Sequence, residues 1–148
     1  MKKFRMAAIV LCLTLFAGIA NAAGIGYLDY AKVIDNFDYA QRVTKEVDAK
    51  GLEMQQYLVD KEKEYKSLDT PLKKQTFEER TAQEFKTKEA AYIALKEKRE
   101  QEVYTKIKEA AKAVMVEQKL DAIIDQRGVF VGGLDITDSV IRKLKGAK

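Results

Sequence analysis

The side chains that most often carry enzymatic chemistry are scarce in this sequence. Its 148 residues include no histidine, and the single cysteine, Cys12, lies in an apolar run near the amino terminus. The two serines, Ser67 and Ser139, have no plausible general base beside them. Gly132-Gly133 lacks the Gly-Lys-Ser/Thr that completes a phosphate-binding loop. Carboxylates are plentiful, but they alternate with lysines along helical patterns. The sequence therefore predicts a protein that is not an enzyme and uses no cofactor or metal.

A run of helix-forming residues, 31–119, occupies most of the chain and is interrupted once, at Pro71. Before this proline, apolar residues recur at alternating steps of four and three residues, which is the spacing of a heptad seam. After the proline, apolar residues form a sparser helical stripe. Proline disfavours helix at the residue before it and suits the first helical turn, so one helix should end near Thr70 and another begin at Pro71. We predict an antiparallel hairpin with its tip near 69–76 and arms of roughly 60 to 70 Å.

The first residues have the pattern of a secretory signal peptide. Lys2, Lys3 and Arg5 precede an apolar run, and Ala20-Asn21-Ala22 follows it as a cleavage signal. We predict that residues 1–22 are cleaved and that 23–148 form one unit in the periplasm; an uncleaved signal anchor is the alternative. The whole sequence has 27 basic and 23 acidic residues. Cleavage would remove three of the basic residues and leave the mature chain with 24 against 23, a net charge of about +1. The mature chain would contain no cysteine and therefore no disulfide.

Short apolar runs flank the predicted hairpin. The segment 24–29 has the alternation of a strand, and Asp29 can cap the helix after it; Asn36 and Asp38 offer a second helix start. The runs 120–125 and 129–131, separated by a turn with glycine, predict a β-hairpin. Thr137 is the expected cap of a closing helix that stops at Gly146.

These end segments must meet for a sheet to form, which closes the helical hairpin at its base. We therefore predict an α+β fold in which residues 23–30 and 120–148 form a small body and 31–119 form the arm. So small a core needs self-association to be stable.

The order of these elements resembles the Skp/OmpH family of periplasmic chaperones over the whole mature chain. The most specific residues are Ile25-Gly26-Tyr27-Leu28-Asp29, Leu120-Asp121-Ala122-Ile123-Ile124-Asp125, Val129-Phe130-Val131 and Leu134-Asp135-Ile136-Thr137-Asp138-Ser139-Val140. The resemblance implies a homotrimer in which three sheets form a central body and three arms surround a cavity. It also implies a holdase that keeps unfolded outer-membrane proteins in that cavity without ATP.

Apolar residues scattered among charges along the arms offer many weak contacts to such a client. The candidates for client contact near and above the tip are Tyr57, Tyr65, Leu68, Phe77, Phe85 and Tyr92. The same residues could instead hold the two arms together. If three chains assemble, the residues predicted at their contacts are Ile25, Tyr27, Ile123, Val129 and Val131.

The charges of the hairpin are read most plainly as a solvated surface. Four pairs at i, i+4 are expected to stabilise its helices: Glu46 with Lys50, Glu62 with Lys66, Glu84 with Lys88, and Glu102 with Lys106. The other interpretation is a surface that attracts anionic or partly unfolded partners, with weak contact to an anionic membrane surface included. A net charge near +1 disfavours nucleic-acid binding. A structural coiled-coil spacer of the cell envelope is the alternative function, although it gives no reason for strands at both ends.

Overall fold

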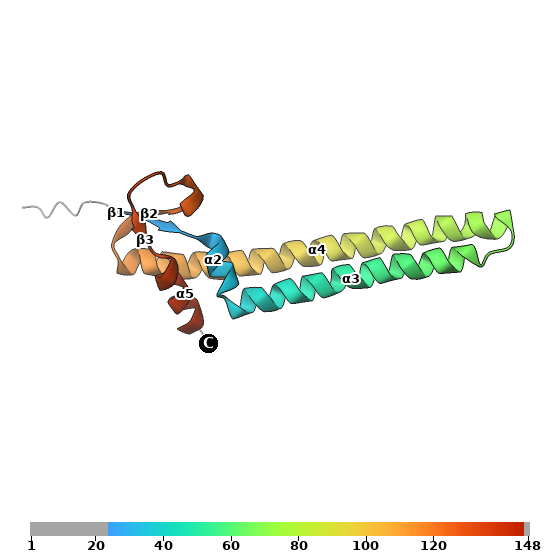
Figure 1. Cartoon of the computed structure of the whole chain (residues 1–148), viewed down its shortest axis with the longest axis horizontal. Coiled ribbons are helices and arrows are strands. Elements are labelled where there is room, and N and C mark those ends of the chain that lie inside the picture. The colour runs from blue at the N-terminus through green and yellow to red at the C-terminus, as the bar shows by residue number, and fades with distance from the viewer. Residues whose placement is uncertain (1–23, 147–148) are drawn as a thin grey trace, which may run out of the picture.

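The structure, a computed structural model, describes residues 24–146; the predicted signal peptide, 1–22, lies outside this range. A small body carries one long helical hairpin that projects away from it (Figure 1). The elements in chain order are β1 (Gly24–Leu28), α2 (Tyr30–Asp35), α3 (Asp38–Lys66), α4 (Pro71–Glu117), β2 (Leu120–Asp125), the 3₁₀ turn η1 (Gln126–Gly128), β3 (Leu134–Asp135) and α5 (Thr137–Gly146). The predicted α+β class is confirmed.

Local signals account for several of the helix boundaries. The Asp29 carboxylate accepts a hydrogen bond from the backbone N–H of Lys32 at 2.9 Å and caps α2. The chain then breaks and restarts at Asp38, where the second start was predicted, although the N-cap residue of α3, Phe37, makes no side-chain capping hydrogen bond. At the tip α3 ends at Lys66, a little before the predicted boundary, and α4 begins at Pro71 as predicted, with Thr70 as its cap.

The three strands form a parallel sheet in the order β2-β1-β3. The predicted β-hairpin is therefore wrong: 129–131 is not a strand, and β3 consists of Leu134–Asp135. Because β1 lies between β2 and β3, the chain must cross over β1 to reach β3. Gly132 and Gly133, with φ of 83° and 87°, turn the chain into β3. A Cβ on Gly133 would lie only 3.1 Å from a ring atom of Tyr27, so a larger residue there would also press on that ring.

The core of the body lies between the sheet and the helices α2, α4 and α5. Its most completely buried side chains are Val33, Val114, Ile136, Thr137 and Val140. Thr137 does not cap α5 as predicted. Its hydroxyl instead accepts a hydrogen bond from the backbone N–H of Asp29 at 3.0 Å, and its own N–H donates to the Asp135 carboxylate at 2.9 Å. The bond from Asp29 joins segments that are 108 residues apart in sequence and satisfies the buried hydroxyl.

The buried core extends only a short way into the hairpin. Ala40 and Val43 are the buried residues of α3, and α4 buries Val103 and Ile107 opposite them. Between this base and the tip, the described part of the arm buries one residue, Phe77. Most of the arm is therefore held together by partly exposed contacts, and we expect it to open more readily than the base.

Candidate functional site

Polar bonds across the hairpin replace the missing core of the arm. The Tyr39 hydroxyl donates to Glu102 at 2.8 Å, and the Tyr57 hydroxyl donates to Glu84 at 2.8 Å. The step from Tyr39 to Tyr57 along α3 equals the step from Glu102 back to Glu84 along α4, so the antiparallel register is kept between the two bonds. These tyrosine–glutamate bonds fix which residues of the two helices face each other.

Arg99 adds an ionic link near the base of the arm. Its guanidinium lies 2.9 Å from the Glu46 carboxylate across the hairpin and 2.9 Å from Glu102 on its own helix. The predicted pairs of Glu46 with Lys50, and of Glu102 with Lys106, are absent from the ion pairs of the described residues. These glutamates instead bond across the hairpin, because they lie beside the seam rather than on the solvated face.

The pKa values of the tyrosines show how these bonds depend on charge. Hydrogen bonding to Glu102 raises the pKa of Tyr39, and for Tyr57 burial raises the pKa most, followed by the bond to Glu84. The bonds from Tyr39 and Arg99 lower the pKa of Glu102. The cross-arm bonds are thus strongest while the tyrosines are neutral and the glutamates are ionised.

The six candidate client contacts lie where the two arms meet. Phe77 is buried, and the other five, Tyr57, Tyr65, Leu68, Phe85 and Tyr92, are half-buried. The rings of Tyr65 and Phe77 pack with centroids 6.1 Å apart. Tyr57, Tyr65 and Phe77 thus make contacts across the hairpin, and client contact by any of the six stays a prediction.

More exposed apolar residues lie on the arm's outer faces, and our reading of the sequence did not single them out. They are Leu52, Val59, Leu72, Ile93 and Tyr104. Leu58, which the heptad spacing places in the predicted seam, is also exposed, at 45 %. Leu52 and Val59 are seven residues apart on α3 and therefore share one stripe, away from the seam. Their departure from the heptad spacing is the signal that could have identified them.

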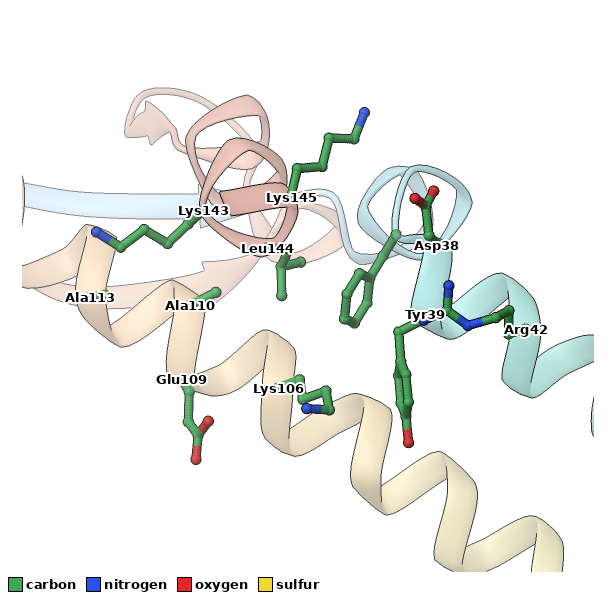
Figure 2. Close-up of a pocket in the computed structure, with 11 residues that line it drawn as sticks. Asp38, Tyr39, Arg42, Lys106, Glu109, Ala110, Ala113, Lys143, Leu144 and Lys145 are labelled. Atoms are coloured by element: carbon green, nitrogen blue, oxygen red, sulfur yellow. The ribbon is translucent and has the colours of Figure 1, made fainter. Parts of the chain in front are cut away.

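A groove of about 610 Å³ lies at the base of the arm, between α3, α4 and α5. Figure 2 shows Leu144 pointing toward α4, while the side chains of Lys143 and Lys145 extend in different directions. Lys143 pairs with Glu117 outside the groove. The Arg42 and Lys106 cations lie 5.9 and 5.1 Å from the centre of the Tyr39 ring. Three of the four cations that line the groove, Arg42, Lys106 and Lys143, thus already have partners, which weakens the groove as an anion-binding site.

The sheet exposes apolar residues on the face away from the core. The register pairs Tyr27 with Ile124, so Ile25 and Ile124 lie on one face, opposite the buried Gly26. Both isoleucines are exposed. The crossover from β2 to β3 arches over the side of the sheet away from α4 (Figure 1).

The crossover is the most exposed apolar segment of the body. Phe130 is fully exposed, and Val131 is 86 % exposed. Of the other residues predicted at chain contacts, Ile25 is exposed, Tyr27 and Val129 are half-buried, and Ile123 packs against the core. Phe130 was not among the predicted contact residues, because the strand assigned to 129–131 directed attention to the valines on either side of it.

No helix within residues 24–146 is both long enough and apolar enough to cross a membrane. A search of curated proteins found no significant match. Among solved structures, the chain is similar to a protein of Caulobacter crescentus CB15 described as an OmpH-like outer membrane chaperone. The two share 15 % identity with a TM-score of 0.43, over 85 % of this chain and 86 % of that one. The family model for outer membrane protein (OmpH-like) matches residues 24–144, and the chain therefore belongs to the OmpH-like family.

Proposed function

We propose that this protein is an ATP-independent holdase chaperone of the periplasm, which binds unfolded outer-membrane proteins between helical arms and prevents their aggregation. The observation that carries the proposal is a long two-helix arm that, beyond its base, leaves nearly all of its apolar side chains half-exposed or exposed among charges, on a chain that belongs to the OmpH-like family. Such an arm offers many weak contacts that can form and break without a nucleotide.

The proposed assembly is a homotrimer joined through the bodies. Soluble monomers rarely expose a large contiguous apolar patch, and patches of this kind mark interaction sites. Ile25, Ile124, Phe130 and Val131 are exposed on or beside the outer face of the sheet, where copies of the chain would cover them. Three arms carried by one body would enclose a space for a client.

The alternative is a structural spacer of the cell envelope. A spacer would need the length of the hairpin but no exposed apolar surface on the sheet. The two functions differ in what they do to an unfolded chain, and an aggregation assay separates them.

The assay dilutes an outer-membrane barrel protein from urea and follows light scattering, with no nucleotide present. The holdase account predicts that scattering is suppressed in proportion to the added protein, and that hydrolysable and non-hydrolysable ATP analogues change nothing. Unchanged aggregation at a severalfold excess of the protein would favour the spacer. A folded soluble protein of similar size and charge is the control.

A further inference from the structure

A second groove lies midway along the arm, where the two helices do not close on each other. Its volume is about 310 Å³, at the lower end of the roughly 300–1,000 Å³ typical of ligand pockets. The lining residues are Lys50, Glu53, Met54, Tyr57, Lys88, Ala91, Tyr92 and Leu95. Two tyrosines, a methionine and a leucine thus surround a space large enough for one side chain of a client.

A glycine beside the groove leaves room for the Tyr92 side chain, which lines it. Gly51 faces Tyr92, and a Cβ placed on Gly51 would lie 3.6 Å from the Tyr92 hydroxyl. A larger side chain at position 51 would occupy part of the space between the helices. On the same stretch Tyr57 is held in place, since its hydroxyl donates to Glu84 at 2.8 Å. The groove therefore has one wall that is already fixed before anything binds.

The groove also carries a cation without a carboxylate partner. Lys50 is neutralised by Glu53, with their charged atoms 2.7 Å apart. Lys88 forms no ion pair within the described residues; its ammonium lies 5.0 Å from the centre of the Tyr57 ring. The predicted partner of Lys88, Glu84, is bonded to Tyr57. An entering group with a negative charge would therefore complement Lys88.

We propose that this groove is a client subsite, which takes one aromatic or branched apolar side chain from an unfolded polypeptide and pairs Lys88 with a carboxylate beside that side chain. The identity of the client rests on the proposed holdase function. The aromatic walls supply the apolar and stacking contact, and Lys88 selects segments that carry an acidic group. One such subsite on each arm gives a weak grip that becomes strong only when several arms engage the same chain.

Two methionines make the subsite directly observable. Met54 lines the groove, and Met115 lies near the carboxyl end of α4 at the base; Met1 and Met6 belong to the predicted signal peptide. The experiment labels the methionine methyl groups with carbon-13 in protein recovered from the periplasm. It then adds N-acetylphenylalanine, which carries both a ring and a carboxylate, or its uncharged amide.

The expected result is a saturable shift of the Met54 methyl signal with little change at Met115. N-acetylphenylalanine should bind several-fold more tightly than its amide, and Lys88→Gln should remove that preference. Equal responses of both methyl groups would overturn the proposal.

Neighbouring alanines provide a matched pair of variants. Ala91 lines the groove, whereas Ala90 does not, and both are exposed residues of α4. Leucine at either position keeps the helix propensity nearly unchanged. Ala91→Leu should fill the groove, abolish the Met54 shift and weaken binding of an unfolded barrel protein roughly tenfold. Ala90→Leu should leave both unchanged.

The outcomes separate this proposal from the holdase function. If the unaltered protein holds the barrel, and Ala91→Leu holds it as well as Ala90→Leu does, the subsite is wrong and the holdase function stands. If the unaltered protein does not hold the barrel, the holdase function fails, and the groove is not a client site. Helix content by circular dichroism and the Met115 signal show whether each variant is folded.

Discussion

Replacing Ile107 with alanine should destabilise the protein far more than the same replacement at Ile93. Both residues are on α4, so helix propensity changes equally in the two variants. They differ in burial: Ile107 is 2 % exposed in the core at the base of the arm, and Ile93 is 46 % exposed on the outer part. The comparison therefore tests whether the base alone supplies the hydrophobic stability of the hairpin.

The magnitude follows from what each side chain loses. At Ile107, alanine removes fully buried methyl and methylene groups and leaves a cavity, which costs about 2–5 kcal/mol. At Ile93 about half of the side chain is already in water, so the loss should be about 1 kcal/mol or less. The expected difference in the free energy of unfolding is thus at least about 1 kcal/mol, with Ile107→Ala the less stable variant.

Urea unfolding followed by circular dichroism at 222 nm measures this difference. The protomer concentration must be the same for all samples, because self-association makes stability depend on concentration. Equal losses for the two variants, or a larger loss for Ile93→Ala, would refute the division into a packed base and a thinly packed arm.

Three further changes test other parts of the structure. Val131→Asp should give a folded monomer in light scattering, because Val131 is exposed in the single chain and a charge there would face the partner; a variant that stays as associated as the parent would exclude this surface from the interface. Gly51→Ala should raise the free energy of unfolding by about 0.5–1 kcal/mol, since its Cβ would make only ordinary van der Waals contact, 3.6 Å from the Tyr92 hydroxyl; a lowered melting temperature would show that the helices approach more closely there. Raising the pH above 10 should loosen the arm. Hydrogen bonding to Glu102 raises the pKa of Tyr39 above its ordinary value of 10.0. The contribution of this bond to stability is therefore complete below pH 10 and is lost as the pH rises through the higher pKa of the folded state. Tyr39→Phe should weaken the alkaline transition seen by circular dichroism, and an unchanged transition would assign it to other groups.

The helical hairpin could be predicted because its signals are local. Pro71 marks the start of the second helix, and the polar residues around Asn36 mark the restart of the first. Each signal acts on backbone groups within a few residues, so it does not depend on the rest of the fold.

The sheet could be predicted only in part, because its order depends on residues distant in sequence. The runs 120–125 and 129–131 look like a β-hairpin when read alone. In the structure β1, which precedes the helical hairpin in sequence, lies beside β2 and takes the place that a hairpin partner would have. The segment 129–131 then becomes a crossover, and its apolar side chains are left exposed.

The polar contacts of the arm show the same limit. Spacing at i, i+4 correctly predicted the ion pair of Glu62 with Lys66, which lies on the solvated side of α3. It was wrong for Glu84, whose carboxylate accepts a hydrogen bond from Tyr57 on the other helix. A residue at the seam has partners on both helices, and the sequence of one helix shows only half of them.

The central claim is that copies of this chain assemble through their bodies and hold an unfolded protein between their arms. Multi-angle light scattering of the purified protein, alone and mixed with an outer-membrane barrel protein diluted from urea, tests it most directly. We predict three times the mass of the mature chain, and, after mixing, a soluble complex heavier by one barrel. A monomer that leaves the barrel to aggregate would contradict both the assembly and the activity.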